Sequence, residues 1–199
     1  MAPPTLSMTM IARDEEATIG RVLFQAKQFC DELIVVDTGS TDRTVSIAEA
    51  AGARVLHFPW VDDFSAARNH ALEAATTDWV IWLDADDVVT REMQGAFSDL
   101  KSSALSEGLD GVYVQYRYHF DENGACTFAF PRERFVRRTE GARWSASCTR
   151  SSSSRVRTSC AARTSTSNTA LRLPSMPARR AGTCGSWRRP SGAATAAGG

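Results

Sequence analysis

The chain has 199 residues with 23 basic and 23 acidic side chains, so its formal net charge is zero. This length suits one α/β domain with a hydrophobic core and excludes a second full domain, and a neutral total argues against a nucleic-acid partner. The neutral total is the sum of two opposite parts, because residues 1–144 carry 14 basic and all 23 acidic residues, a net of −9, whereas residues 145–199 carry nine Arg and no acid, a net of +9.

The first part of the chain alternates short apolar runs with segments of helical periodicity. The pattern predicts strands at residues 5–12, 33–36, 54–58 and 79–83, and helices at residues 17–30, 41–51 and 63–75. Ser40 or Thr41 is expected to cap the second helix, and Gly52 stands where a helix C-terminus favours a left-handed residue. Strands that alternate with helices in this way form parallel βαβ units, so the fold class is α/β with a mostly parallel sheet.

The pattern changes after residue 90. A looser helix is predicted to about residue 106, followed by an antiparallel hairpin with one strand at 111–120 and a second that ends near residue 130. From residue 145 the composition is mainly Ser, Thr, Ala, Gly and Arg, which buries too little apolar surface to offset the entropy of ordering. We therefore expect a folded domain at residues 1–144 and a disordered basic tail at residues 145–199.

Signals for secretion, membrane insertion and metal binding by cysteine are missing from the sequence. The N-terminus has no basic start, and no stretch approaches the roughly 20 apolar residues of a membrane span. We expect a cytoplasmic protein, with peripheral membrane association left open. The five cysteines form no CxxC pair and no zinc spacing with the histidines, so reduced thiols are expected. No role is assigned to His57, His70 or His119.

Acidic residues follow three of the predicted strands: Asp14 follows the first, Asp37 the second, and residues 84–87 the fourth. Because the carboxyl ends of parallel strands share one edge of a sheet, these carboxylates are expected to converge there. Asp84 and Asp86 are two apart in an extended segment, so they point the same way and can hold a divalent cation whose shell substrate phosphates complete. The alternative is an ordinary solvated turn or helix cap.

Four segments carry a resemblance to a known family. Residues 11–16, 34–44, 58–69 and 82–87 closely resemble successive motifs of family 2 glycosyltransferases, and the match spans residues 5 to about 144 in order. The resemblance implies a GT-A fold, a nucleotide-diphospho-sugar donor such as a UDP-sugar, Mn²⁺ or Mg²⁺, and inversion at the anomeric carbon. A diphosphate leaving group gains charge in the transition state, and a divalent cation stabilises that charge.

The resemblance also implies which residues contact the nucleoside. Ala12 and Arg13 would lie against the base, with Asp14 next to them in the nucleotide-sugar site. Asp37 would hydrogen-bond the uracil or the ribose.

Further residues are implied around the diphosphate. Arg68 would lie near the diphosphate, and Asn69 would hold that loop. Asp84, with Ala85 next to it, would approach the ribose or the metal, and Asp86 would be the main metal ligand.

Other polar and aromatic residues near these motifs have structural interpretations. Asp42 and Arg43 fit a helix cap and a surface charge. Trp60, Trp79 and Trp82 fit core aromatics better than sugar-stacking platforms.

The sequence contains no recognisable general base, which an inverting transferase needs. In similar sequences the stretch that resembles residues 132–144 runs into an acidic segment with His-Glu, whereas here no acid follows residue 144. We hypothesise that the coding frame shifts near residue 145. The rival is a genuine basic tail that binds RNA or an acidic surface.

The expected protein is a truncated GT-A domain that binds a nucleotide diphosphate but transfers sugar poorly or not at all. The acceptor, a glycan, lipid-linked sugar or peptide, is left open.

Two other enzyme classes and one non-enzymatic class are alternatives. A sugar-1-phosphate nucleotidyltransferase would have a glycine-rich phosphate loop after the first strand, where this chain is acidic. A dinucleotide oxidoreductase would have GxGxxG at that place, and it is absent. A non-enzymatic module would use the basic tail to bind nucleic acid.

Overall fold

The computed structural model describes residues 2–102, 109, 111–139 and 142–144. The end of the predicted fourth helix and the predicted tail at 145–199 lie outside the described residues. No helix in the described part of the chain combines the length and the apolar content needed to cross a bilayer. The elements are β1 Leu6–Ala12, α1 Ile19–Ala26, β2 Glu32–Asp37, α2 Thr44–Ala50, β3 Arg54–His57, α3 Phe64–Ala74, β4 Trp79–Trp82, α4 Arg91–Ser102, β5 Gly111–Phe120 and β6 Cys126–Arg137.

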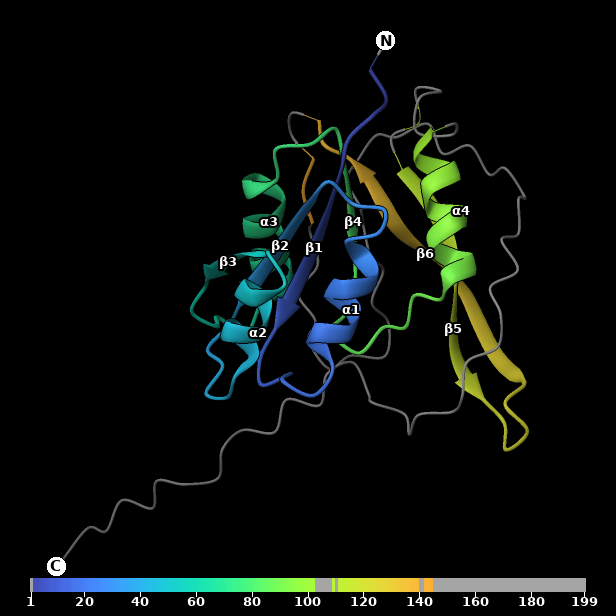
Figure 1. The fold of residues 1–199 in the computed structure, drawn as a ribbon, viewed down its shortest axis with the longest axis horizontal. Helices are drawn as coiled ribbons and strands as arrows, with labels where there is room; N and C mark the ends of the chain where they lie inside the picture. Colours follow the sequence, from blue (N-terminus) through green and yellow to red (C-terminus); the bar gives the residue numbers. More distant parts are fainter. Residues whose placement is uncertain (1, 103–108, 110, 140–141, 145–199) are drawn as a thin grey trace, which may run out of the picture.

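The strands form one six-stranded sheet in the order β3-β2-β1-β4-β6-β5. The first four strands are parallel, as the alternation of strands and helices predicted, and β5 and β6 form the predicted antiparallel hairpin. Figure 1 shows α1 and α4 on the near face of the sheet and α3 behind it. The carboxyl ends of β1, β2 and β4 therefore meet at one edge.

Each face of the sheet has its own apolar core, because successive side chains of a strand point to opposite faces. On the α1 and α4 face, Met8, Leu23, Ile81 and Phe97 belong to one buried cluster. On the α3 face, the buried cluster contains alternate residues of the same strands together with small residues of α3, namely Ile34, Val36, Val80, Ala67 and Ala71. The two cores hold the sheet edge in place from both sides.

Strand β6 differs from the prediction, which ended this strand near residue 130. It continues to Arg137 and pairs antiparallel with β4, with Val136 opposite Val80 and Phe135 opposite Ile81. Phe135 is fully buried, so the apolar pair at 135–136 extends the strand even though charged residues surround it. Because of this pairing, the polar residues of β6 lie beside the carboxyl end of β4.

Two helix starts also differ from the prediction. Helix α2 begins at Thr44, and neither Ser40 nor Thr41 caps it, because both bond to Asp14 instead. The helix cap predicted at Asp42 is displaced by one residue: Arg43 occupies the N-cap position, and Asp42 before it accepts a hydrogen bond from the Thr44 amide at 2.9 Å. Gly52 has φ 86° just after α2, the left-handed conformation that its position predicted.

Helix α1 begins at Ile19 rather than near residue 17. Its acidic neighbours Glu15 and Glu16 therefore precede the first helical turn and belong to the loop after β1.

Candidate functional site

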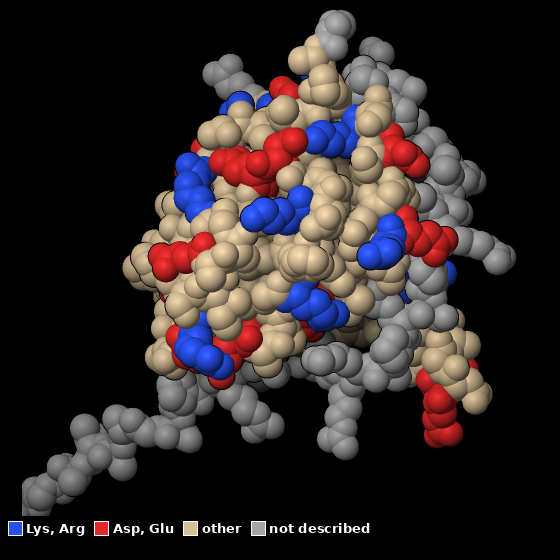
Figure 2. All heavy atoms as spheres, in the orientation of Figure 1, with Lys and Arg blue, Asp and Glu red and all other residues tan. Residues whose placement is uncertain are grey.

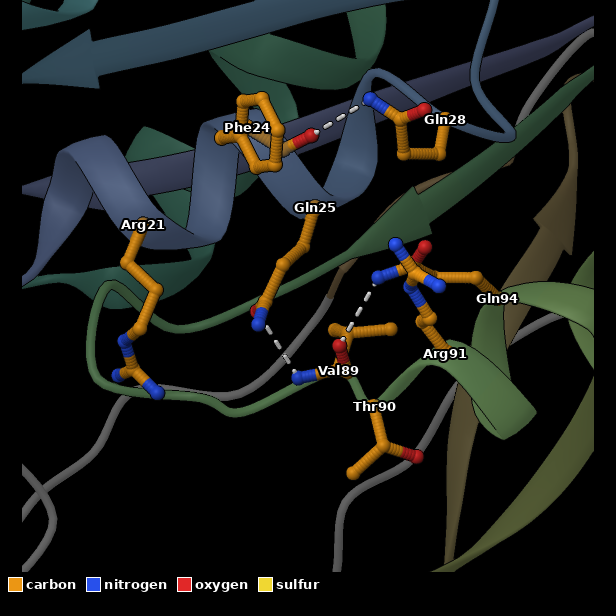
Figure 3. Close-up of a pocket in the computed structure, with 8 residues that line it drawn as sticks. All are labelled: Arg21, Phe24, Gln25, Gln28, Val89, Thr90, Arg91 and Gln94. Atoms are coloured by element: carbon orange, nitrogen blue, oxygen red, sulfur yellow. Dashed lines mark hydrogen bonds between the residues drawn. The ribbon is translucent and has the colours of Figure 1, made fainter.

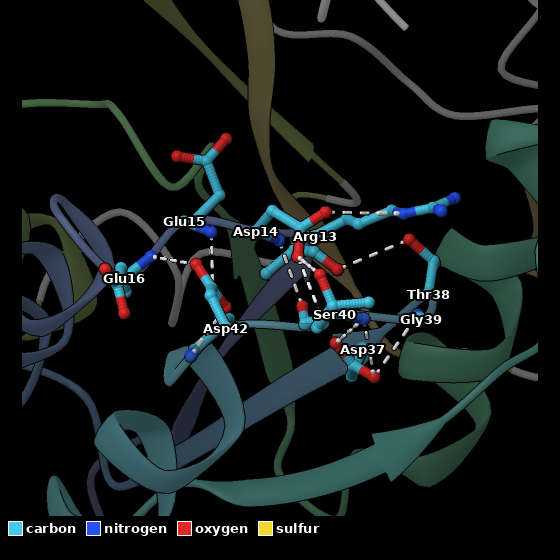
Figure 4. A network of polar contacts seen from close by, with 12 residues as sticks. Arg13, Asp14, Glu15, Glu16, Asp37, Thr38, Gly39, Ser40 and Asp42 are labelled. Atoms are coloured by element: carbon cyan, nitrogen blue, oxygen red, sulfur yellow. Dashed lines mark hydrogen bonds and ion pairs between the residues drawn. The ribbon is translucent and has the colours of Figure 1, made fainter. Parts of the chain in front are cut away.

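The loops after β1 and β2 are bonded to each other (Figure 4). The amide of Asp14 donates to Oγ of Ser40 at 3.0 Å, and Oδ1 of Asp14 accepts from the amide of Thr41 at 2.7 Å. Asp14 has φ 54°, a conformation uncommon outside glycine, which these contacts hold in place. The two strand ends thus form one ordered polar surface.

Asp37, the last residue of β2, is almost fully buried and folds back on its own loop. Its carboxylate accepts from the amides of Gly39 at 3.2 Å and Ser40 at 3.1 Å. Burial alone would raise the pKa of Asp37, but the hydrogen bonds from Ser40 and Gly39 outweigh it and hold the pKa below its usual value. His57 Nδ1 lies 3.4 Å from Asp37 Oδ2, so this histidine has a partner that the sequence did not reveal.

The residues expected against the base lie at the end of β1. Ala12 is buried, and its carbonyl accepts from the amide and the hydroxyl of Thr38 at 3.0 and 3.3 Å. Arg13 is partly exposed, with Nε 3.8 Å from Asp14 Oδ2. Figure 4 shows the Arg13 guanidinium beside the Asp14 carboxylate.

The segment after β4 separates its acidic side chains. Asp87 is turned inward, where its Oδ2 accepts from the amide of Asp84 at 2.9 Å. The Asp84 side chain is 40% exposed and Asp86 is exposed, whereas Ala85 is buried in the α1 and α4 core. The loop therefore presents two carboxylates outward, and Ala85 can offer a ligand only its backbone.

Arg134 of β6 holds this acidic loop. Its side chain is only 5% exposed, Nη1 donates to the carbonyl of Trp82 at 2.9 Å, and the same atom forms an ion pair with Asp87 Oδ2 at 3.1 Å. Nη2 also lies 3.8 Å from Asp84 Oδ2. Burial lowers the pKa of Arg134, but Asp87 and Asp84 outweigh it and raise the pKa above its usual value. The guanidinium remains charged and fixes the position of the loop.

The expectation that the carboxylates at the three strand ends meet around one cation is wrong. Within the described ranges no group of three or more carboxylates, histidines or cysteines stands close enough to hold a metal ion. Asp37 is bonded to the amides of its own loop and Asp14 to Thr41, so neither joins Asp84 and Asp86 around one cation. What remains is the pair Asp84 and Asp86, which fits a cation that takes most of its ligands from substrate and water.

Glu15 gives the electrostatic argument for a cation at this edge. Burial raises the pKa of Glu15, against a hydrogen bond from the Thr18 hydroxyl, and the negative charges of Asp86 and Asp84 raise it further. The carboxylates that follow β1 and β4 thus repel one another at this edge. A divalent cation would relieve that repulsion.

Two residues of α3, Arg68 and Asn69, lie close to the acidic loop. Arg68 Nη2 is 3.8 Å from Asp84 Oδ1, and its Cζ lies 3.7 Å from the ring centre of Trp82. Asn69 donates to the carbonyl of Trp144 at 3.0 Å and accepts from its amide at 2.7 Å. Asn69 thus attaches residue 144 beside Arg68, whose Cζ is 5.2 Å from the Trp144 ring centre.

A pocket between α1 and the start of α4 lies apart from these residues. Figure 3 shows Gln25 and Gln94 bonded to the amide and carbonyl of Val89, with Phe24 at the rim. None of the residues predicted for the site lines it. Arg21, which lines the pocket, donates to the carbonyl of Asp86 at 3.3 Å and so contacts the acidic loop.

The aromatic interpretations hold in part. Trp79 and Trp82 are buried as expected, whereas Trp60 is half-buried and packs edge-on against Phe64. Sequence reasoning missed the guanidinium of Arg134. The only signal for it was that this residue follows Arg132 at strand spacing in the segment after the hairpin turn.

Comparison with known proteins agrees with this geometry. The model of the family "Glycosyl transferase family 2" matches residues 7–158. A TPR repeat-containing protein of Synechococcus elongatus is 53% identical over 97 residues, which cover 49% of this chain and 23% of that protein. An uncharacterized glycosyltransferase of Rickettsia felis is 38% identical over 89 residues, 45% of this chain and 31% of that protein. The matched part of the chain therefore spans less than a third of these relatives.

Among solved structures, glucosyl-3-phosphoglycerate synthase from Mycobacterium tuberculosis in complex with UDP has a TM-score of 0.52 at 25% identity. The match covers 68% of this chain and 57% of that one. Another structure of that enzyme contains Mn²⁺, UDP and glucosyl-3-phosphoglycerate. It has a TM-score of 0.48 at 32% identity over 57% of this chain and 44% of that one. The predicted GT-A fold is confirmed by the sheet order, the family match and the first of these structures.

Proposed function

The chain belongs to glycosyl transferase family 2, and from this premise we propose that it binds a nucleotide-diphospho-sugar, with UDP as the nucleotide, at the carboxyl edge of β1, β2 and β4. The observation that carries the proposal is the loop after β4. There Asp84 and Asp86 face outward while Arg134 holds Asp87 inward. The solved relative that contains UDP supports the choice of nucleotide.

Each part of the edge has a proposed task. Asp86 and Asp84 bind Mn²⁺ or Mg²⁺, and a bound cation of this kind stabilises the charge of a leaving diphosphate. Asp37 binds the uracil or the ribose through lone pairs that Gly39 and Ser40 leave unused. Ala12 and Arg13 lie against the base. These assignments rest on the order of the strand ends and on the exposed carboxylates.

Transfer to an acceptor is expected to be weak or absent. Inversion requires a base that takes the proton of the attacking hydroxyl. Residues 145–199 contain no Asp, Glu or His to supply one. We propose that binding of the sugar donor is preserved. Transfer of the sugar to the acceptor, a glycan, lipid-linked sugar or peptide, is weak or absent. The proposed place of action is the cytoplasm.

Calorimetric titration with UDP tests the donor site. Binding should need Mn²⁺ or Mg²⁺, and Asp86→Asn should weaken it by about tenfold or more, since it removes a charged metal ligand. Glu73→Gln is the matched control, because Glu73 is exposed on α3 and the change removes the same charge. Equal UDP affinities for Asp86→Asn and Glu73→Gln would contradict the proposal.

A nucleic-acid-binding module is the other class of function. On the face shown in Figure 2, basic and acidic side chains of the described residues are interspersed, which does not favour a phosphate backbone as partner. A salt-dependent mobility shift with generic RNA, lost when residues 145–199 are deleted, would support that class instead.

A further inference from the structure

Three guanidinium groups surround a single indole ring beside the acidic loop. The Cζ atoms of Arg68, Arg134 and Arg132 lie 3.7, 4.0 and 4.7 Å from the ring centre of Trp82. Arg68 comes from α3 and the other two from β6, so tertiary packing brings the three charges together. Attraction to the ring face offsets only part of their mutual repulsion.

The nearby carboxylates form ion pairs with two of the three guanidinium groups. Asp84 lies 3.8 Å from both Arg68 and Arg134, and Asp87 pairs with Arg134 at 3.1 Å. Arg132 makes no ion pair within the described part of the chain. Its Cζ also lies 5.3 Å from the ring centre of Tyr116 and 6.0 Å from that of Phe130.

Arg68 has Asp84 as its anion. The Arg68 side chain is 20% exposed, and its Nη2 lies 3.8 Å from Asp84 Oδ1. A divalent cation on Asp84 would compete with Arg68 for that carboxylate. Arg68 and Arg132 would then be two cations against the Trp82 ring without a matching anion.

The order of the strands indicates which anion belongs here. A nucleoside at β2 and β1 and a diphosphate at β4 leave β6 and β5 for the sugar and the acceptor, because the ligand runs along one edge of the sheet. Arg132 and Tyr116 stand on β6 and β5. They therefore face the part of the site beyond the diphosphate.

We propose that Arg132, with Arg68 beside it, forms an oxyanion site on the acceptor side of Trp82, and that the acceptor presents a phosphate or carboxylate group to it. The inference rests on the proposed function, which fixes where the donor lies. A planar guanidinium binds such an oxyanion through two parallel hydrogen bonds. The site selects a negatively charged acceptor over a neutral sugar.

The test uses the full chain saturated with UDP and Mg²⁺, into which inorganic phosphate is titrated at constant ionic strength. Arginine Nε–Hε signals of ¹⁵N-labelled protein report which side chains respond. We expect saturable shifts of Arg132 and Arg68, and about tenfold weaker phosphate binding in Arg132→Gln, as expected for a lost charge-assisted contact. Arg137→Gln is the control, because Arg137 is exposed on the same strand.

Two outcomes would overturn the proposal. If phosphate displaces UDP, or shifts these signals only when UDP is left out, the guanidiniums serve the donor diphosphate. If Arg132→Gln binds phosphate as tightly as Arg137→Gln, the group only packs on Trp82. UDP affinity is measured on the same samples, so loss of UDP binding in the unmodified chain marks failure of the proposed function instead. Arg132→Lys keeps the charge without the fork and should give intermediate affinity, which provides a second readout if Arg132→Gln does not fold.

Discussion

Nη1 of Arg134 lies 3.1 Å from Oδ2 of Asp87, so a cation on β6 and an anion after β4 are held together almost out of contact with water. The pair connects the antiparallel hairpin to the loop that carries Asp84 and Asp86. The hairpin and the acidic loop are therefore mechanically linked.

Replacing Arg134 with Met should destabilise the fold by about 3 kcal/mol, because the change leaves a buried carboxylate without its cation. Chemical denaturation measures the loss. Arg137→Met, on the exposed side of the same strand, should stay within about 0.5 kcal/mol of the unmodified chain. The double change Arg134→Met with Asp87→Asn should recover part of the stability, and a double variant no more stable than the single one would contradict this explanation.

The carboxylate of Asp37 should make stability depend on pH. Its pKa is lowered in the folded state, so its contribution is present above the unfolded value of about 4 and is lost as pH falls through the folded value. The difference in unfolding free energy between the unmodified chain and Asp37→Asn should therefore shrink below about pH 4. A difference that stays constant from pH 7 to pH 3 would show that Asp37 is not the titrating group.

Asn69→Ala should release Trp144 from α3, because both hydrogen bonds to the backbone of that residue are lost. Arg143 is exposed, so trypsin cleavage after it reports the release. The fragment ending at residue 143 should appear several times faster than in the unmodified chain, since cleavage follows local opening. Asn123→Ala in the hairpin turn is the control, and equal rates for both variants would argue against the attachment.

The hypothesis of a shifted reading frame near residue 145 is tested on the gene. One of the other two frames should encode an acidic segment with His-Glu and renewed apolar periodicity. If neither frame does, the basic tail is genuine and the missing base needs another explanation.

Much of the fold could be predicted because β1 to β4 are apolar runs separated by helices of regular period. Strand β6 was predicted too short, since its partner β4 lies about fifty residues away and local pattern does not reveal it. The cap of α2 was wrong because Ser40 and Thr41 bond across the edge to Asp14, a contact between loops distant in sequence. The acidic loop was found from its spacing, but its geometry depends on Arg134.

Asn69 fixes the point where the chain leaves the described domain. Residue 144 is held beside Arg68, next to the acidic loop after β4. A restored C-terminal sequence would need no long connection to bring its first residues to the attacking hydroxyl.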